Sequence, residues 1–263
     1  MNFLHAALLG LIEGLTEFLP VSANAHVIIL GNLLEEPAPL VRSFGVALQA
    51  APTLAVLILY WRRFEALILP SSAGHDAFQG ARAWTLMAAG TLPVMVVGFL
   101  FKHYFYSLME SPWPSVAALA LGGLVILVVE QRHKDSQGVD FGGISPSQAL
   151  GIGLIQCLAL WPGVSRSGAT IIAGLLLGLN RNASAEFSFL IGAPVFAAAS
   201  AHEIIKSGLL KDELAPFAVA FAVSFGCALL SVSLMMKWLG KMSFKPFGWY
   251  RLGLSPILWY LFK

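Results

Sequence analysis

The chain has 263 residues, of which 57% are hydrophobic and only 11% are charged, and its formal net charge is +2. Soluble domains carry roughly 25% charged residues, so this composition excludes an ordinary soluble protein, and the small net charge predicts no nucleic-acid partner. Divided into membrane spans of about 20 residues, the chain is predicted to be an all-α, polytopic integral membrane protein, a single membrane domain over residues 1–263.

The chain begins with an apolar helix that charge and proline interrupt. Residues 2–19 are predicted to be helical and contain Glu13 and Glu17, whose spacing places both carboxylates on one face. Pro20 breaks this helix, and a second apolar piece follows over residues 22–33. Because a broken helix with ionisable groups is costly in lipid unless it lines a cavity, we predict a re-entrant hairpin here.

Six further apolar segments are predicted to cross the membrane. Residues 34–42 are expected to be a loop, and residues 65–83 a loop with room for a short interfacial helix. A hydrophilic run over residues 130–143 divides the chain into halves of about 1–130 and 144–263. The predicted spans are residues 44–61, 84–101, 115–129, 186–205, 214–236 and 247–262.

The second half also opens with a broken helix. Residues 146–160 are predicted to be an apolar helix that ends at Trp161-Pro162-Gly163, and apolar residues resume after Thr170. A shift of 143 positions (153 − 10) aligns the two breaks, which indicates an internal duplication. The aligned pairs include Gly10 with Gly153, Glu13 with Gln156, Ser22 with Ser165, and Gly31 with Gly174.

Basic residues orient the two halves. Alternation of the predicted spans places most loop Lys and Arg on one side, which the positive-inside rule assigns to the cytoplasm. The first hairpin then enters from outside and the second from inside, so the halves are predicted to be inverted-topology repeats whose tips meet near mid-membrane. The residues predicted to be cytoplasmic are Arg62, Arg63, Arg82, Arg132, Lys134, Arg181, Lys237, Lys241 and Lys245.

The second break carries the residue types of an anion site. Ser165, Ser167 and Thr170 supply hydroxyls, Gly168 permits close backbone approach, and Arg166 supplies a fork of donors suited to phosphate. A helix that begins near Ser165 would add free N–H groups and its positive dipole end. We therefore predict a phosphate site. The alternative is a structural turn, capped by the hydroxyls, with the arginine reaching toward an interface.

The first break carries the residue types of a cation site. Glu13 and Glu17 together can hold a hard divalent cation whose other positions are left to water and substrate phosphates. His26 follows near the same pocket, and a histidine can act as nucleophile, general base or ligand. We favour catalysis. The alternatives are a carboxylate pair satisfied by backbone and water, and a buried structural histidine.

Two segments resemble a known family. Residues 13–26 (EGLTEFLPVSANAH) and 162–170 (PGVSRSGAT) resemble the signature regions of undecaprenyl-pyrophosphate phosphatase, the bacitracin-resistance (BacA/UppP) family, and the resemblance runs through essentially the whole chain. It implies hydrolysis of a polyprenyl pyrophosphate to the monophosphate and phosphate, which recycles the carrier lipid for peptidoglycan and other envelope polymers. It also implies a Mg²⁺ or Ca²⁺ cofactor, a bacterial inner-membrane location, and a site that opens to the periplasmic side.

The family's residues carry over with one departure. The resemblance implies that Glu13 and Glu17 hold the metal. Ala23 has no hydroxyl where the family commonly has a serine, so His26 is the preferred nucleophile or activator of water, and Ser22 is a weaker candidate. The predicted catalytic residues are His26, Glu17, Glu13 and Arg166, and the predicted substrate-binding residues are Ser22, Asn24, Ser165, Arg166, Ser167, Gly168 and Thr170.

Two other functions stay open at this point. Inverted repeats with broken helices are typical of transporters, so a transporter or flippase of a phosphorylated prenyl lipid is the main alternative. A non-catalytic lipid-binding or scaffold protein is the other, and it would be favoured if Ala23 reflects lost activity. The predicted partners are the polyprenyl pyrophosphate and membrane lipid, and a homodimer is left open.

Overall fold

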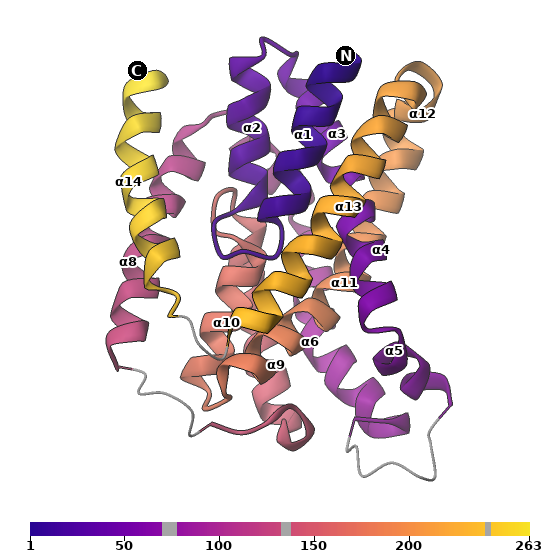
Figure 1. Cartoon of the computed structure of the whole chain (residues 1–263), viewed down its shortest axis with the longest axis vertical. Helices are drawn as coiled ribbons and strands as arrows, with labels where there is room; N and C mark the ends of the chain where they lie inside the picture. The colour runs from indigo at the N-terminus through magenta and orange to yellow at the C-terminus, as the bar shows by residue number, and fades with distance from the viewer. Residues whose placement is uncertain (70–77, 133–137, 240–242) are drawn as a thin grey trace.

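The computed structural model describes residues 1–69, 78–132, 138–239 and 243–263, and these residues are folded almost entirely into helices (Figure 1). A single isolated β-bridge joins Val139 and Leu179 within them. The elements are, in chain order, α1 (Phe3–Thr16), α2 (Ala23–Leu33), α3 (Ala38–Leu48), α4 (Ala50–Leu59), α5 (Trp61–Ile68), α6 (Gly80–Leu100), α7 (Lys102–Leu108), α8 (Trp113–Arg132), η1 (Phe141–Gly143), α9 (Pro146–Gln156), η2 (Cys157–Leu160), α10 (Arg166–Leu176), α11 (Arg181–Ser207), α12 (Leu209–Asp212), α13 (Leu214–Leu239) and α14 (Lys245–Leu261).

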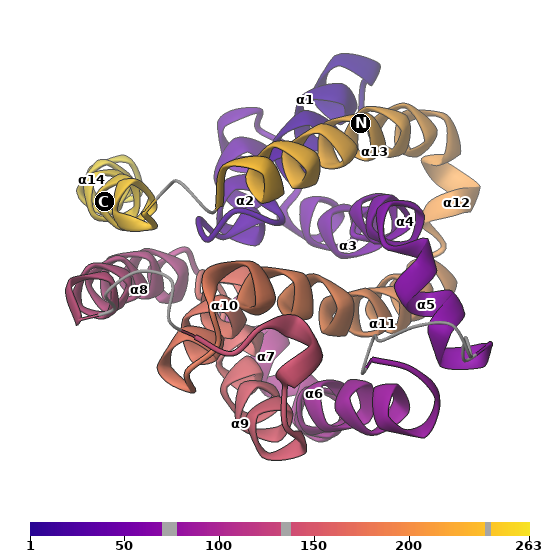
Figure 2. The same ribbon diagram turned by 60° about the horizontal axis from the view of Figure 1, so that its bottom comes forward.

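Five helical segments of the described chain are long and apolar enough to cross a membrane, which identifies a polytopic membrane protein. The predicted sixth span corresponds to α14, which has 17 residues and lies alongside α8 in both Figure 1 and Figure 2. The five segments are Ala38–Leu59, Gly80–Leu100, Trp113–Arg132, Arg181–Ser207 and Leu214–Trp238.

Two helical hairpins enter the molecule from opposite ends (Figure 1). The α1–α2 hairpin starts at the end where both termini lie, and the α9–α10 hairpin starts at the other end. Local sequence explains where they start, since the Asn2 side chain accepts from the His5 amide at 2.7 Å and Ser145 forms a capping box with Gln148. Their tips meet inside the molecule, where the Ser167 hydroxyl donates to the Glu17 carbonyl at 3.1 Å.

Each hairpin packs closely on one long helix. A Cβ atom at Gly10 would collide with the Ala220 carbonyl of α13. A Cβ atom at Gly153, the residue aligned with Gly10, would likewise collide with the Ala89 carbonyl of α6. Small residues at such contacts let helix backbones approach closely in membranes. The first helix of each hairpin is therefore held against its neighbour by the same device.

The predicted elements are largely confirmed, and one of them is wrong. Residues 34–42 were expected to be a loop, but α3 begins at Ala38. Pro39 stands in its first turn, where the missing amide hydrogen costs nothing because the helix needs no donor there. The helix predicted over residues 146–160 is observed, with its last turn tightened into η2.

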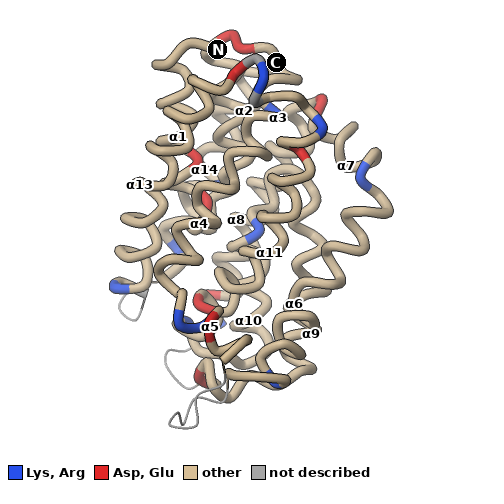
Figure 3. Tube along the Cα trace, turned by 90° about the vertical axis from the view of Figure 1, so that its right-hand side faces the viewer, with Lys and Arg blue, Asp and Glu red and all other residues tan. Residues whose placement is uncertain are grey.

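The charged residues gather at the two ends of the molecule (Figure 3). In that view the lower end carries basic residues near α5 and at the end of α13 and acidic residues near α5 and α10, and the upper end likewise carries both kinds. Two of the residues predicted to be cytoplasmic, Lys134 and Lys241, fall outside the described residues.

A cluster of buried apolar side chains lies beside the meeting point of the hairpins. Phe18 of the first tip packs edge-on against Phe189 of α11, with ring centroids 5.0 Å apart. Ile171 and Leu175 of α10 and Val232 of α13 belong to the same cluster. This packing covers one side of the junction with apolar side chains.

Candidate active site

The first hairpin places two carboxylates in the interior. Glu13 is fully buried and Glu17 is 6% exposed, four residues further along at the end of α1. Among the described residues, neither oxygen of the Glu13 carboxylate has a hydrogen-bond partner. A buried carboxylate without donors is costly. Glu13 therefore requires a proton or a cation that the surrounding side chains do not supply.

The second hairpin places an arginine opposite these carboxylates. Helix α10 begins at Arg166, and the Ser165 hydroxyl caps it by accepting from the Gly168 amide at 3.1 Å. The Arg166 guanidinium donates to the Glu17 carboxylate at 3.3 Å and to the Ser188 carbonyl at 2.9 Å. Its Nε has no partner among the described residues. The guanidinium thus keeps a free donor.

The charges of this cluster do not balance. Glu13, Glu17 and the Arg166 guanidinium sum to −1 (−2 + 1) when all are ionised, and the junction's other cation, Arg251, donates to backbone carbonyls rather than to these carboxylates. In a medium of low dielectric constant an unbalanced charge is expensive. A bound divalent cation would change the sum to +1, and the site would then attract a phosphate.

Ser167 ties the two hairpins together, and Thr170 ties α10 to α11. The Ser167 hydroxyl lies within hydrogen-bond distance of the carbonyls of Glu17 and Leu19, at 3.1 and 3.0 Å. The Thr170 hydroxyl contacts the Arg166 carbonyl at 2.8 Å and the Ser188 hydroxyl at 2.6 Å. Both hydroxyls are fully buried. They are already engaged with protein atoms, so their observed contacts are structural.

Two serines at the tips have an uncommon backbone conformation. Ser22 has φ 73° and Ser165 has φ 64°, and these residues align in the two halves. A residue other than glycine in this region costs on the order of 1–3 kcal/mol and is common at functional sites. The two tips therefore share one strained turn geometry.

Arg251 of α14 lies between the two tips and is 1% exposed. One of its terminal nitrogens donates to the Pro20 carbonyl at 3.1 Å, and the other donates to the Gly163 carbonyl at 2.9 Å. Pro20 and Gly163 also align at the shift of 143. Further bonds reach the carbonyls of Val164, Ala118 and Leu119. A single side chain therefore fixes equivalent points of both hairpins.

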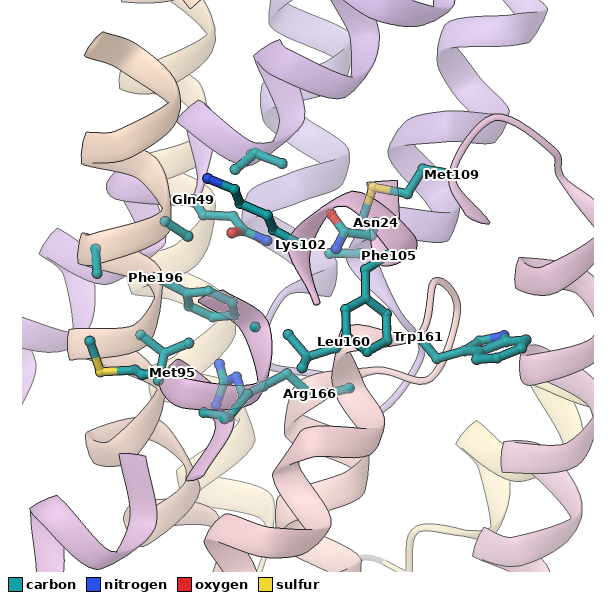
Figure 4. Close-up of a pocket in the computed structure, with 18 of the residues that line it drawn as sticks. Asn24, Gln49, Met95, Lys102, Phe105, Met109, Leu160, Trp161, Arg166 and Phe196 are labelled. Carbon is teal, nitrogen blue, oxygen red and sulfur yellow. The ribbon is translucent and has the colours of Figure 1, made fainter. Parts of the chain in front are cut away.

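A cavity of about 430 Å³ opens from this junction. Figure 4 shows the Arg166 guanidinium turned toward Phe196, with Lys102 and Gln49 across the cavity. The remaining wall is largely apolar, with side chains from α6, α7 and α11. Five of the predicted site residues line it: Glu17, Ser22, Asn24, Ser165 and Arg166.

The structure keeps the other predicted residues out of the cavity wall. Of the described residues that line it, none is Glu13, His26, Ser167, Gly168 or Thr170. His26 instead faces α14, where its Nε2 lies 2.6 Å from the Tyr250 hydroxyl and the two rings are stacked. Its Nδ1 lies 2.8 Å from the Ser22 carbonyl, which can only accept. Nδ1 is therefore the protonated nitrogen, and Nε2 accepts from Tyr250.

Sequence reasoning missed the residues that position Arg166. The guanidinium lies 4.6 Å from the ring centroid of Phe196, a cation–π contact. A Cβ atom at Gly192 would come within 2.6 Å of the guanidinium, so glycine leaves it room. Arg251 was also missed, although a lone arginine in an apolar segment is the same signal that drew attention to Arg166.

The residues present fit a divalent cation in part. No group of three or more His, Cys, Asp or Glu side chains suited to a metal occurs in the described chain. Glu13 nevertheless offers two buried oxygens without donors, beside Glu17. Oxygen ligands of this kind suit Mg²⁺ or Ca²⁺, with water and phosphate oxygens completing the shell.

Comparison with known proteins gives one consistent match. Residues 6–257 match the family described as bacitracin resistance protein BacA. The chain is 44% identical over 259 residues to the undecaprenyl-diphosphatase of Oleidesulfovibrio alaskensis, covering 98% of this chain and 97% of that one. It is 42% identical over 261 residues to that of Nitratidesulfovibrio vulgaris, covering 98% of each. It is 39% identical over 271 residues to that of Campylobacter jejuni, covering 100% and 95%.

Proposed function

The chain belongs to the bacitracin resistance protein BacA family, and we propose that it hydrolyses undecaprenyl diphosphate at the junction of its two hairpins. It is an undecaprenyl-diphosphatase like the relatives that it matches over nearly their full length. One observation carries the location of the site. Arg166 and Glu17 line the cavity and contact each other at 3.3 Å, and Glu13, one helical turn before Glu17, has a buried carboxylate without a donor among the described residues.

The reaction replaces one P–O bond by another. An oxygen of water attacks the terminal phosphorus, and the bond between this phosphorus and the bridging oxygen breaks. The lipid monophosphate leaves with the electron pair, and the proton lost by water goes to a base or to a product oxygen. Arg166 lines the cavity, so its guanidinium would bind the diphosphate and stabilise the charge that develops on the phosphate oxygens.

Glu13 and Glu17 are the side chains that would hold Mg²⁺ or Ca²⁺ in this site. When bound, the cation neutralises phosphate charge and polarises the phosphorus. Support comes from the charge sum of the cluster and from the two oxygens of Glu13 that have no donor among the described residues.

The identity of the attacking group is a separate part of the proposal. Ser22 lines the cavity in a strained conformation, whereas both nitrogens of His26 are engaged with Ser22 and Tyr250. A direct role for His26 as nucleophile or general base stays a prediction, and it requires the ring to leave Tyr250. In the observed contacts both His26 nitrogens are bonded, and the ring holds the turn at Ser22. Because His26 is then not free to attack phosphorus, we favour water as the nucleophile.

The apolar wall suits the prenyl part of the substrate. Met95, Phe99, Phe105 and Phe196 are apolar residues of the cavity wall. Burial of apolar surface contributes about 25 cal/mol per Å², so such a wall would bind the chain next to its head group. We place the rest of the tail in the lipid.

We further propose six spans and two re-entrant hairpins, arranged as inverted repeats of about 1–130 and 144–263 in a bacterial inner membrane. The paired strained serines and the paired carbonyls bound by Arg251 support the repeat. Helix α14 has 17 residues, which falls within the range of about 17–25 residues for membrane-spanning helices. Its length therefore supports α14 as the sixth span. The positive-inside rule would open the site to the periplasmic side.

The test is phosphate release by the purified protein from undecaprenyl diphosphate, with and without a chelator. Release that stops with chelator and returns with Mg²⁺ or Ca²⁺ is expected. The main alternative, a transporter of phosphorylated prenyl lipid, releases no phosphate in detergent. Arg166→Ala protein should be inactive, and turnover near that of the wild type would contradict the assignment of the site.

A further inference from the structure

The cavity continues beyond the catalytic junction to a polar end that the proposed chemistry does not use. Lys102, Tyr106 and His202 line the same cavity as Arg166 and Glu17, and Lys102 lies across it from Arg166 (Figure 4). Lys102 begins α7, and His202 belongs to α11. Between the two ends the cavity wall is largely apolar.

Lys102 is a half-buried cation without a carboxylate partner. It forms no ion pair with any described residue, and its Nζ lies over Phe99, 5.5 Å from the ring centroid. Cations at cavity walls of low dielectric constant focus their field into the cavity. An anion in this part of the cavity would therefore be stabilised by Lys102.

Glu203, the carboxylate next to His202 in α11, is already bound by Tyr106. The Tyr106 hydroxyl donates to buried Glu203 at 3.1 Å. Burial and the Glu203 carboxylate raise the pKa of Tyr106, so the phenol keeps its proton and its donor role. Arg42 and Lys206 lie over the same ring, at 5.6 and 5.0 Å from its centroid. Lys102 donates to neither Tyr106 nor Glu203 among the described contacts, so its charge is available to a ligand.

We propose that Lys102 and His202 form a second phosphate-binding site at the outer end of the cavity, separate from Arg166. Its ligand class is a phosphate anion, either the head group of an arriving lipid or the inorganic phosphate that leaves. This inference rests on the proposed function, because that function produces phosphate at the inner end of the same cavity.

A second phosphate-binding site further out in the cavity would have a physical advantage. Phosphate released beside Arg166 is held by a buried cation and has an apolar wall to pass. A second cation further out lowers the energy of the anion along that path, so release does not depend on one step from the buried site to water. The same field would attract a diphosphate head group on its way in.

The experiment compares Lys102→Met with the wild type in two measurements. The first is turnover of undecaprenyl diphosphate that is radiolabelled at its terminal phosphate, with unlabelled inorganic phosphate added as a product inhibitor. The second is equilibrium binding of radiolabelled inorganic phosphate, which needs no turnover. Lys102→Arg keeps the charge and should restore wild-type values in both. Lys206→Met is the matched control, because Lys206 is not among the described residues that line the cavity.

We expect Lys102→Met to weaken inhibition and binding by phosphate about three- to tenfold, the range of one charge-assisted contact partly exposed to water. Lys206→Met should stay within about twofold. A raised KM for the lipid with unchanged phosphate inhibition would identify the head group as the ligand, and the reverse would identify free phosphate. His202→Gln should shift the same quantities if Lys102→Met fails to fold.

Failure of the outer site can be distinguished from failure of the proposed function. If the wild type binds phosphate and Lys102→Met binds it equally well, with equal inhibition and KM, the outer site is overturned. An equal effect of Lys206→Met would also overturn it, since a general field would then explain the result. If the wild type releases no phosphate from the lipid, the proposed function fails, and the binding measurement still decides the outer site.

Discussion

Replacement of Arg251 by lysine tests how the two hairpin tips are held together. The guanidinium donates to five carbonyls at 2.9–3.4 Å, and three of them, those of Pro20, Gly163 and Val164, belong to the tips. The other two lie within α8 and can keep their helical partners. A lysine ends in one nitrogen, so we expect Arg251→Lys to keep the carbonyls of only one hairpin.

The magnitude follows from the carbonyls left without a donor. If the lysine keeps the second hairpin, the carbonyl of Pro20 is left without a donor. If it keeps the first, the carbonyls of Gly163 and Val164 are left without one. Each buried unpaired carbonyl costs about 1–3 kcal/mol, so the free energy of unfolding should fall by about 1–6 kcal/mol. Misplacement of groups in the site by about 1 Å can cost roughly 10²-fold in rate, so turnover should fall as well.

Two assays check this prediction together. Denaturant unfolding of the purified protein in detergent measures the loss of stability, and phosphate release measures the loss of turnover. Lys245→Met, an exposed substitution on the same helix, should change stability by no more than about 0.5 kcal/mol. If Arg251→Lys matches the wild type in both assays, Arg251 does not hold the tips and our reading of the junction is refuted.

Three further predictions concern the inner site. Gly192→Ala should lower turnover and lower the free energy of unfolding by about 1–3 kcal/mol, because its methyl group would displace the Arg166 guanidinium. Gly226→Ala is the control, because Gly226 has open space around it. This control should leave turnover unchanged and leave stability unchanged or raise it by up to about 1 kcal/mol. Tyr250→Phe should keep turnover within about fivefold of the wild type, because His26 keeps its bonds to the Ser22 carbonyl, and a loss beyond about 100-fold in the kinetic assay would place the ring in the chemistry. Chelation should abolish phosphate release, and Glu13→Gln should raise the Mg²⁺ or Ca²⁺ concentration needed for half-maximal activity; an unchanged metal requirement in that variant would remove Glu13 from the cation site.

Features encoded by neighbouring residues could be predicted from the sequence. Proline marks both helix breaks, at Pro20 and Pro162, and Ser165 precedes a helix that it caps. The meeting of the two breaks could also be predicted, because the basic residues orient the halves in opposite directions. The contact between Arg166 and Glu17, 149 residues apart in the chain, is the result.

Features that depend on packing between distant helices could not be predicted. The direction of the His26 ring depends on where α14 places Tyr250, which no local pattern encodes. The room that Gly192 leaves for Arg166 depends on how α10 and α11 pack. The start of α3 was missed for a different reason, since prolines and charges are typical both of loops and of a helix's first turn.

Phosphate release by Glu17→Gln protein tests the central claim most directly. This substitution keeps the size of the side chain and removes the charge that meets Arg166 and would hold the cation. We predict that release from undecaprenyl diphosphate falls by about 10²-fold or more relative to the wild type, in protein that remains folded by circular dichroism. Release at the wild-type rate would contradict a site at the junction of the two hairpins.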